Sequence, residues 1–355
     1  FATTALVATA GVAMADVAIS GYAEMGIAGG GDDAINGTGG VSQFFQDIDV
    51  TFTMSGTTDN GLTFGAGVDI DETAAGTNSF DDNGTTVFIS GDFGTLTMGD
   101  TDGALDFVIT ENFGNPGSID DSETLHAGYL GSFLDGLYDG QILRYDYSFD
   151  AFTFAVSVEM DDADIADAGY AIGVGYDMAI AGGSVALGLG YQSANVVGAA
   201  ASANPVIDND PTSPTFGDPI ADVGGSTVEL ANLGDYGIVI PVAAGDSLDI
   251  EAIAFSAGVT LDSGFTGGVM YNDWDIEGTD VTHMAISAGY TFDAISVGAN
   301  YGIFELDGTD ASGFGLAASY DLGGGASIHA AYGDSDIDGV DGDFQSWSLG
   351  LAMSF

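Results

Sequence analysis

The last twelve residues, Phe344–Phe355, read FQSWSLGLAMSF. From Trp347 to Phe355 every second residue is large and apolar, and the residues between them are serine, glycine or alanine. A period of two places the two sets on opposite faces of a β-strand. A soluble sheet turns its apolar face inward and shows water a polar, often charged face, whereas here the second face is small and uncharged. The pattern therefore predicts a strand with its apolar face toward lipid and its small face toward a wet interior.

The composition of the whole chain supports the same interpretation. Its 355 residues include 54 acidic side chains and a single basic one, Arg144, so the formal net charge is −53. Mean hydropathy is nevertheless positive, at +0.26, which requires charge and apolar surface to be separated in space. The absence of Cys excludes disulfides and thiolate metal sites. Such acidity excludes nucleic acid as a partner and attracts cations instead.

The first fifteen residues are small and apolar and end in Ala13-Met14-Ala15. We interpret residues 1–15 as the remnant of a signal peptide with an A-x-A cleavage site, the alternative being an Ala-rich mature N-terminus. Residues 16–355 are then expected to form one domain. No later stretch has 18 or more consecutive apolar residues, so we expect no spanning helix. An exported chain of this kind is either an outer-membrane barrel or a secreted β-protein.

Alternation of apolar with small or polar residues recurs along most of the chain. It predicts sixteen strands, near residues 16–28, 44–56, 62–71, 85–91, 95–100, 141–148, 151–160, 169–178, 184–193, 247–260, 265–276, 281–292, 295–306, 313–322, 326–333 and 344–355. Short turns alternate with longer, mostly acidic connections, which is how outer-membrane barrels are built. We therefore predict an all-β fold, a transmembrane antiparallel up-and-down barrel of about sixteen strands, whose interior is too wide for side chains to fill.

Two long stretches lack the alternation. Residues 101–140 are rich in Gly, Asp and aromatic residues, and their apolar side chains indicate that this segment packs against something. Residues 195–246 hold five of the six prolines.

Three stretches resemble the general porins of alphaproteobacteria, of the Rhodobacter type: residues 50–59 (VTFTMSGTTD), 84–100 (GTTVFISGDFGTLTMGD) and 315–327 (GLAASYDLGGGAS). The terminal Phe355 matches as well, whereas the insertion at 195–246 departs from the family. The resemblance implies a homotrimer of sixteen-stranded barrels in the outer membrane, among lipid and lipopolysaccharide. It also implies that a third outer loop, here residues 101–140, folds inward as a constriction, and that small hydrophilic solutes pass by diffusion.

In such porins, acids on the constriction loop face a basic cluster on the wall, which a chain with one basic residue cannot build. Arg144 follows the segment 101–140 directly, and strand parity turns Arg144 and Asp146 into the interior. We expect Arg144 at the pore wall, paired with a carboxylate of the loop. The alternative is an ordinary structural salt bridge within the barrel wall.

The remaining candidate pore residues are mostly acidic. On the loop they are Asp102, Asp106, Glu111, Asp120, Asp121 and Glu123, with His126 as a titratable neighbour, and on the first strands they are Glu24, Asp47, Asp49 and Asp69. Rings of carboxylates select for cations, so we expect a cation preference that weakens as the coupled carboxylates protonate. Extreme acidity in a saline habitat is the alternative explanation. His283 and His329 are expected to face the interior as polar side chains beside water.

Residues 334–339 open like an EF-hand loop, D-x-D-x-D-G, but position 12 is Gln345 and begins a strand, so we reject an EF-hand. A looser Ca²⁺ site on Asp334, Asp336 and Asp338 is a candidate beside a simple solvated loop. No cofactor is otherwise required, and no nucleophile–base pair or phosphate loop indicates an enzyme. The alternative function is a secreted, salt-adapted β-protein or adhesin that binds Ca²⁺.

Overall fold

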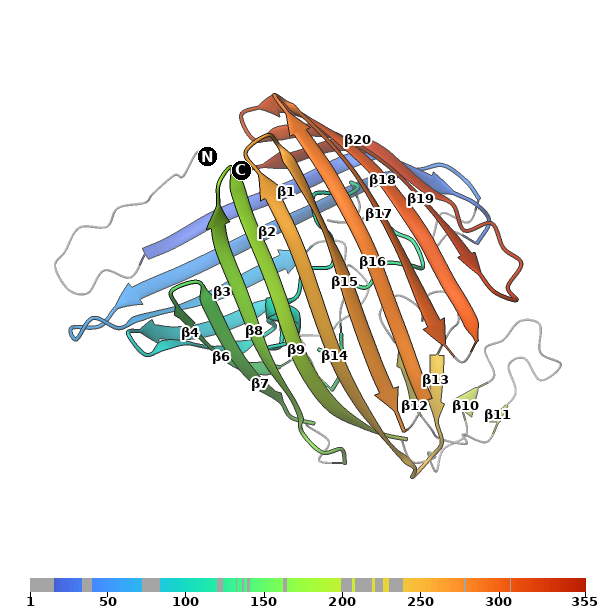
Figure 1. Cartoon of the computed structure of the whole chain (residues 1–355), viewed down its shortest axis with the longest axis horizontal. Coiled ribbons are helices and arrows are strands. Elements are labelled where there is room, and N and C mark those ends of the chain that lie inside the picture. The colour runs from blue at the N-terminus through green and yellow to red at the C-terminus, as the bar shows by residue number, and fades with distance from the viewer. Residues whose placement is uncertain are drawn as a thin grey trace.

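Sixteen strands close into one antiparallel barrel in chain order (Figure 1). Closure occurs where β1 (Asp16–Gly30) pairs with β20 (Ser346–Ser354), so the first and last strands meet in the wall. The computed structural model describes residues 16–33, 40–71, 84–119, 124–131, 133–135, 137–138, 141–161, 165–198, 206–207, 219–220, 226–229, 239–277, 279–306 and 308–355. The predicted all-β, up-and-down barrel is confirmed, and the proposed signal remnant at 1–15 lies outside these residues.

The other barrel strands follow the predicted ranges closely. They are β2 (Gln43–Thr57), β3 (Thr63–Asp71), β4 (Thr85–Gly91), β5 (Gly94–Gly99), β6 (Ile142–Phe149), β7 (Phe152–Glu159), β8 (Gly169–Ile180), β9 (Gly183–Val197), β14 (Ser247–Leu261), β15 (Phe265–Ile276), β16 (Thr279–Phe292), β17 (Ile295–Leu306), β18 (Thr309–Gly323) and β19 (Ala326–Ile337).

Most large apolar side chains of the strands point away from the barrel axis. On β20, Trp347 and Leu349 are exposed, whereas Ser346 and Ser348 on the other face are buried. Exposed apolar residues continue in the same register around the barrel, for example Ile253 and Phe255 on β14. An outward band of this kind suits a hydrocarbon surround. Rows of apolar residues turned outward are the reverse of a soluble sandwich, which buries them between its sheets.

The short connections lie at one end of the barrel. The turn after β2 is closed by the Gly61 N–H, which donates to the Thr58 carbonyl at 2.9 Å, and Gly61 has a φ of 87° that favours glycine. The long connection between β9 and β14 lies at the end of the barrel opposite to the C-terminus (Figure 1). Its described parts are two small hairpins, β10 (Val206–Ile207) with β11 (Pro219–Ile220) and β12 (Ser226–Glu229) with β13 (Val239–Val242).

The segment between β5 and β6, residues 101–140, folds into the barrel and is called the inner loop below. Figure 1 shows its teal trace within the ring of strands. Its only described helix is the 3₁₀ turn η1 (Asp106–Val108). Leu105, Leu130 and Phe133 of the loop belong to one buried cluster with Trp274 and Phe304 of the wall. The core of this protein is therefore the contact between the inner loop and the inner wall.

Among the described residues, no helix is long and apolar enough to cross a membrane.

Candidate pore constriction

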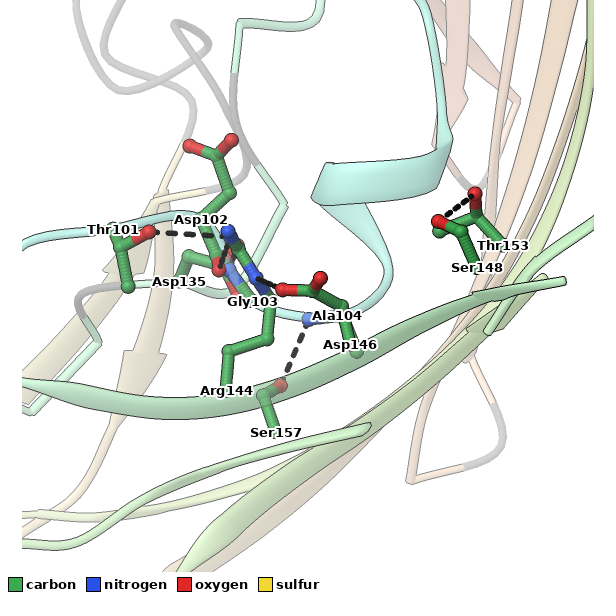
Figure 2. A network of polar contacts seen from close by, with 10 residues as sticks. All are labelled: Thr101, Asp102, Gly103, Ala104, Asp135, Arg144, Asp146, Ser148, Thr153 and Ser157. Carbon is green, nitrogen blue, oxygen red and sulfur yellow. Dashed lines mark hydrogen bonds and ion pairs between the residues drawn. The ribbon is translucent and has the colours of Figure 1, made fainter. Parts of the chain in front are cut away.

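Arg144 fixes the start of the inner loop to the wall. It lies on β6, immediately after the loop in sequence, and its side chain is buried. Its Nη1 donates to Thr101 Oγ1 at 3.1 Å and to the Asp102 main-chain oxygen at 2.6 Å (Figure 2). Its Cζ also lies 3.8 Å from the centroid of the Phe107 ring in η1, a cation–π contact. One guanidinium therefore holds both the first residues of the loop and its helical turn.

The ion-pair partner of Arg144 is Asp146, two residues along the same strand. Arg144 Nε lies 3.6 Å from Asp146 Oδ1 (Figure 2). Alternate residues of a strand share a face, which brings the two side chains within reach. The expectation that a loop carboxylate would form this ion pair is wrong, although the loop meets Arg144 through a hydroxyl, a main-chain carbonyl and the nearby charge of Asp135. Arg144 therefore lies on the barrel wall and also forms a structural salt bridge within that wall.

Asp135 ties the far end of the inner loop to its start. Its Oδ2 accepts the Gly103 N–H at 2.6 Å, and its Oδ1 accepts Gln192 Nε2 at 2.6 Å. Ser157 of β7 accepts the neighbouring Ala104 N–H at 2.8 Å. Burial raises the pKa of Asp135, while these hydrogen bonds and the charge of Arg144 oppose the rise. The sequence did not identify Asp135, Gln192 and Ser157 as residues that attach the loop. Strand parity does turn Ser157 inward, which could have indicated its role.

Asp106 and Glu111 form a hydrogen-bonded carboxyl pair on the inner loop. Burial, and then the charge of Asp106, raise the pKa of Glu111 to about 9. Burial, and then the charge of Asp135, raise the pKa of Asp106 to about 7, although the hydrogen bond to Glu111 opposes this. Two carboxyl groups this close cannot both ionise cheaply, so the pair retains a proton at neutral pH.

We expect docking of the inner loop to weaken as the pH rises from 7 to 9. A carboxyl whose pKa is raised in the folded protein contributes stability at low pH, and that contribution is lost as the pH rises through the folded pKa. Each contribution declines from the ordinary carboxyl pKa of about 4 upward, and the loss is complete near pH 7 for Asp106 and near pH 9 for Glu111. Glu111→Gln keeps a neutral hydrogen-bonding side chain, so its loop should respond little over this range. Protease cleavage within the loop at pH 6 and pH 9 measures the difference.

The matched control for that measurement is Asp92→Asn, since Asp92 is an exposed acid of the turn between β4 and β5, away from the pair. It should keep the native pH response. An identical response in the native protein and in Glu111→Gln would show that the pair holds no proton at pH 7.

Carboxylates also occupy the inner faces of the first three strands. Glu24 of β1 stands opposite Asp47 of β2, and Thr51 Oγ1 donates to Asp69 Oδ1 of β3 at 2.9 Å. Asp69 is exposed, whereas Glu24 is buried and accepts the Tyr22 hydroxyl at 2.7 Å. Glu24 is therefore less open to water than Asp69. Like charges opposite one another destabilise a sheet, so this acidic wall maintains a negative potential at a structural cost.

The histidines differ from their expected roles. His126 is fully buried, and its Nδ1 accepts the Gly128 N–H at 3.2 Å. Burial lowers the pKa of His126 to about 4, so it stays neutral and does not titrate at the pore near pH 7. His283, expected beside water, is also fully buried, because the inner loop covers it. His329 is half-buried and bonds the Ser327 hydroxyl at 2.9 Å.

Three predicted acids of the loop, Asp120, Asp121 and Glu123, lie outside the described residues. Of the other candidates, Asp102 is exposed, while Asp47, Asp49, Asp106, Glu111 and Asp146 are half-buried.

The calcium site on Asp334, Asp336 and Asp338 gains no support. Asp334 accepts the Tyr332 hydroxyl at 3.3 Å, and the Asp338 N–H donates to the Asp310 carbonyl at 2.9 Å. Within the part of the chain that the structure describes, no group of three or more His, Asp or Glu side chains could hold a metal ion.

Comparison with known proteins agrees with this architecture. The sequence profile of Gram-negative porins matches residues 2–340. A porin of Rhodobacter capsulatus is 32% identical over 347 residues, which cover 92% of this chain and 96% of that protein. A solved porin structure gives a TM-score of 0.61 at 24% identity, over 96% of this chain and 100% of that chain. A multiply substituted mutant of Rh. blastica porin gives 0.56 at 16% identity with the same coverage.

The two solved structures share the fold, and the sequence matches show the family. They do not favour the alternative of a secreted calcium-binding β-protein or adhesin. The chain belongs to the Gram-negative porin family and is a channel of the outer membrane rather than an enzyme.

Proposed function

We propose that this porin is a cation-selective diffusion pore, with carboxylates of the inner loop and of the β1–β3 wall along the path. The supporting observation is where the only basic side chain of the sequence lies. Arg144 is buried at the loop's attachment, beside Asp146 and Asp135. His126, the histidine of the inner loop, is neutral near pH 7. No basic side chain of the sequence is then left to offset the acids that face the passage.

The mechanism is passive. Small hydrophilic solutes and cations diffuse through the water between the inner loop and the uncovered wall. Exposed carboxylates such as Asp102 and Asp69 raise the local concentration of cations and repel anions. We further propose that the barrels assemble as homotrimers among outer-membrane lipid and lipopolysaccharide, which a heat-sensitive oligomer in detergent gels would support.

Reversal potentials across a KCl gradient in planar bilayers test the selectivity. At pH 7 and about 0.1 M salt, where the Debye length is about 10 Å, the potential should correspond to preferred passage of K⁺. Raising the salt to about 1 M shortens the Debye length to about 3 Å, so the preference should shrink. Acid should shrink it too, because protonated carboxyls carry no charge. A potential that favours chloride at pH 7 is incompatible with the proposal.

A further inference from the structure

The main chain of the inner loop contacts the wall at several glycines, and five of these contacts involve a loop carbonyl oxygen at the shortest distances. A Cβ atom at any of the five would lie far inside the contact distance of a loop carbonyl oxygen. The wall glycines are Gly173, Gly188, Gly289, Gly302 and Gly333, and the carbonyls belong to Ala104, Val108, Gly114, Gly128 and Leu125 respectively. These glycines lie on β8, β9, β16, β17 and β19, so the contact extends around much of the barrel.

Serine side chains of the wall accept hydrogen bonds from main-chain N–H groups that the loop cannot pair by itself. Ser256 accepts the Thr110 N–H at 3.1 Å, Ser287 accepts the Phe113 N–H at 2.6 Å, and Ser335 accepts the Ala127 N–H at 2.9 Å. Buried amides need partners, and a loop without its own ladder must find them elsewhere. The small inner face thus serves the loop in two ways, because glycines admit its carbonyls and hydroxyls pair its amides.

Two of the contacts join glycine to glycine. Gly289 of β16 faces Gly114 of the loop, and Gly302 of β17 faces Gly128. At the second contact His283 Nε2 lies 2.9 Å from the Gly128 oxygen, within hydrogen-bond distance, and the His283 ring packs on Phe304. Neither Gly289 nor Gly302 has a positive φ, so their backbones accept any residue and only space requires glycine.

We propose that Gly289 and Gly302 are positioning residues that set the width of the pore. They allow the inner loop to lie directly on the wall, which leaves the rest of the interior open. A methyl group at either position would push the loop away from the wall by on the order of 1 Å, since non-bonded atoms need about 3.5 Å. The displaced loop can move only into the lumen. The inference concerns width, so it holds whether or not the pore prefers cations.

Single-channel conductance of Gly289→Ala and Gly302→Ala in symmetric KCl tests the proposal. Both should lose conductance relative to the native channel, with the sign of the reversal potential unchanged. Gly175→Ala is the matched control: Gly175 lies on the barrel strand β8, and the nearest atom to its added Cβ is Thr153 Cβ at an ordinary 3.7 Å. Native conductance in both test variants, in channels that assemble normally, would overturn the proposal.

Should the alanine variants fail to assemble, Ser287→Ala tests the same contact without adding volume. It removes the acceptor of the buried Phe113 N–H. We expect more current flicker and faster protease cleavage within the inner loop. Ser184→Ala, an exposed serine at the start of β9, is its control and should behave as native. Identical behaviour of the two serine variants would equally overturn the proposal.

Discussion

Replacing Arg144 with alanine should release the start of the inner loop and give a noisier channel. The change removes the donors to Thr101 and Asp102 and the cation that rests on the Phe107 ring. It also leaves Asp146 without its ion-pair partner. Removing one member of a buried pair costs about 3 kcal/mol or more, a large fraction of what holds a single loop in place. Single-channel recording should show frequent transitions between conductance levels that the native channel lacks.

Two further variants separate the roles of the Arg144 side chain. Arg144→Lys keeps the charge, but an ammonium cannot reach Thr101 and Asp102 and lie flat on a ring at once, so flicker should be intermediate. Asp146→Asn removes the ion pair and leaves the guanidinium contacts to the loop, so its conductance should stay near native. If Arg144→Ala records like the native channel, the loop is held by its other contacts and Arg144 is only a buried counter-ion.

The barrel was predictable because its signal is local. Strand parity depends on a two-residue period, and rows such as Trp347, Leu349 and Leu351 show it without knowledge of any partner strand. Parity also turned Arg144 and Asp146 inward correctly. The partner of Arg144 on the loop was not predictable, because the inner loop has no period that fixes where its side chains and carbonyls lie.

The small residues of the inner face show a second limit of prediction from the sequence. On β20, a glycine or serine beside water and one beside a loop have the same sequence signature. Ser348 accepts the Ile119 N–H at 3.4 Å, and Gly350 leaves room for the Ile119 side chain, so part of this face packs against the inner loop. His283 was placed beside water for the same reason, since parity gives the direction of a side chain but not what covers it.

Converting the acidic wall to amides should remove much of the cation preference. Asp47→Asn, Asp49→Asn and Asp69→Asn together take three carboxylates from the inner faces of β2 and β3, and asparagine preserves their shape and hydrogen bonding. Their field acts over about a Debye length, which is comparable with the width of a pore at 0.1 M salt. The reversal potential in a KCl gradient should therefore fall severalfold toward zero, while conductance changes little.

The matched control decides between selectivity and adaptation to salt. Asp59→Asn, Asp92→Asn and Asp262→Asn remove the same number of charges from exposed short turns outside the barrel strands. Because net charge changes identically, a field confined to the passage predicts a large shift for the wall variant and almost none for the turn variant. Equal reversal potentials in the two triple variants would mean that the acids act only as a solvated surface. The charge of −53 would then reflect the medium around the protein rather than the ions that pass through it.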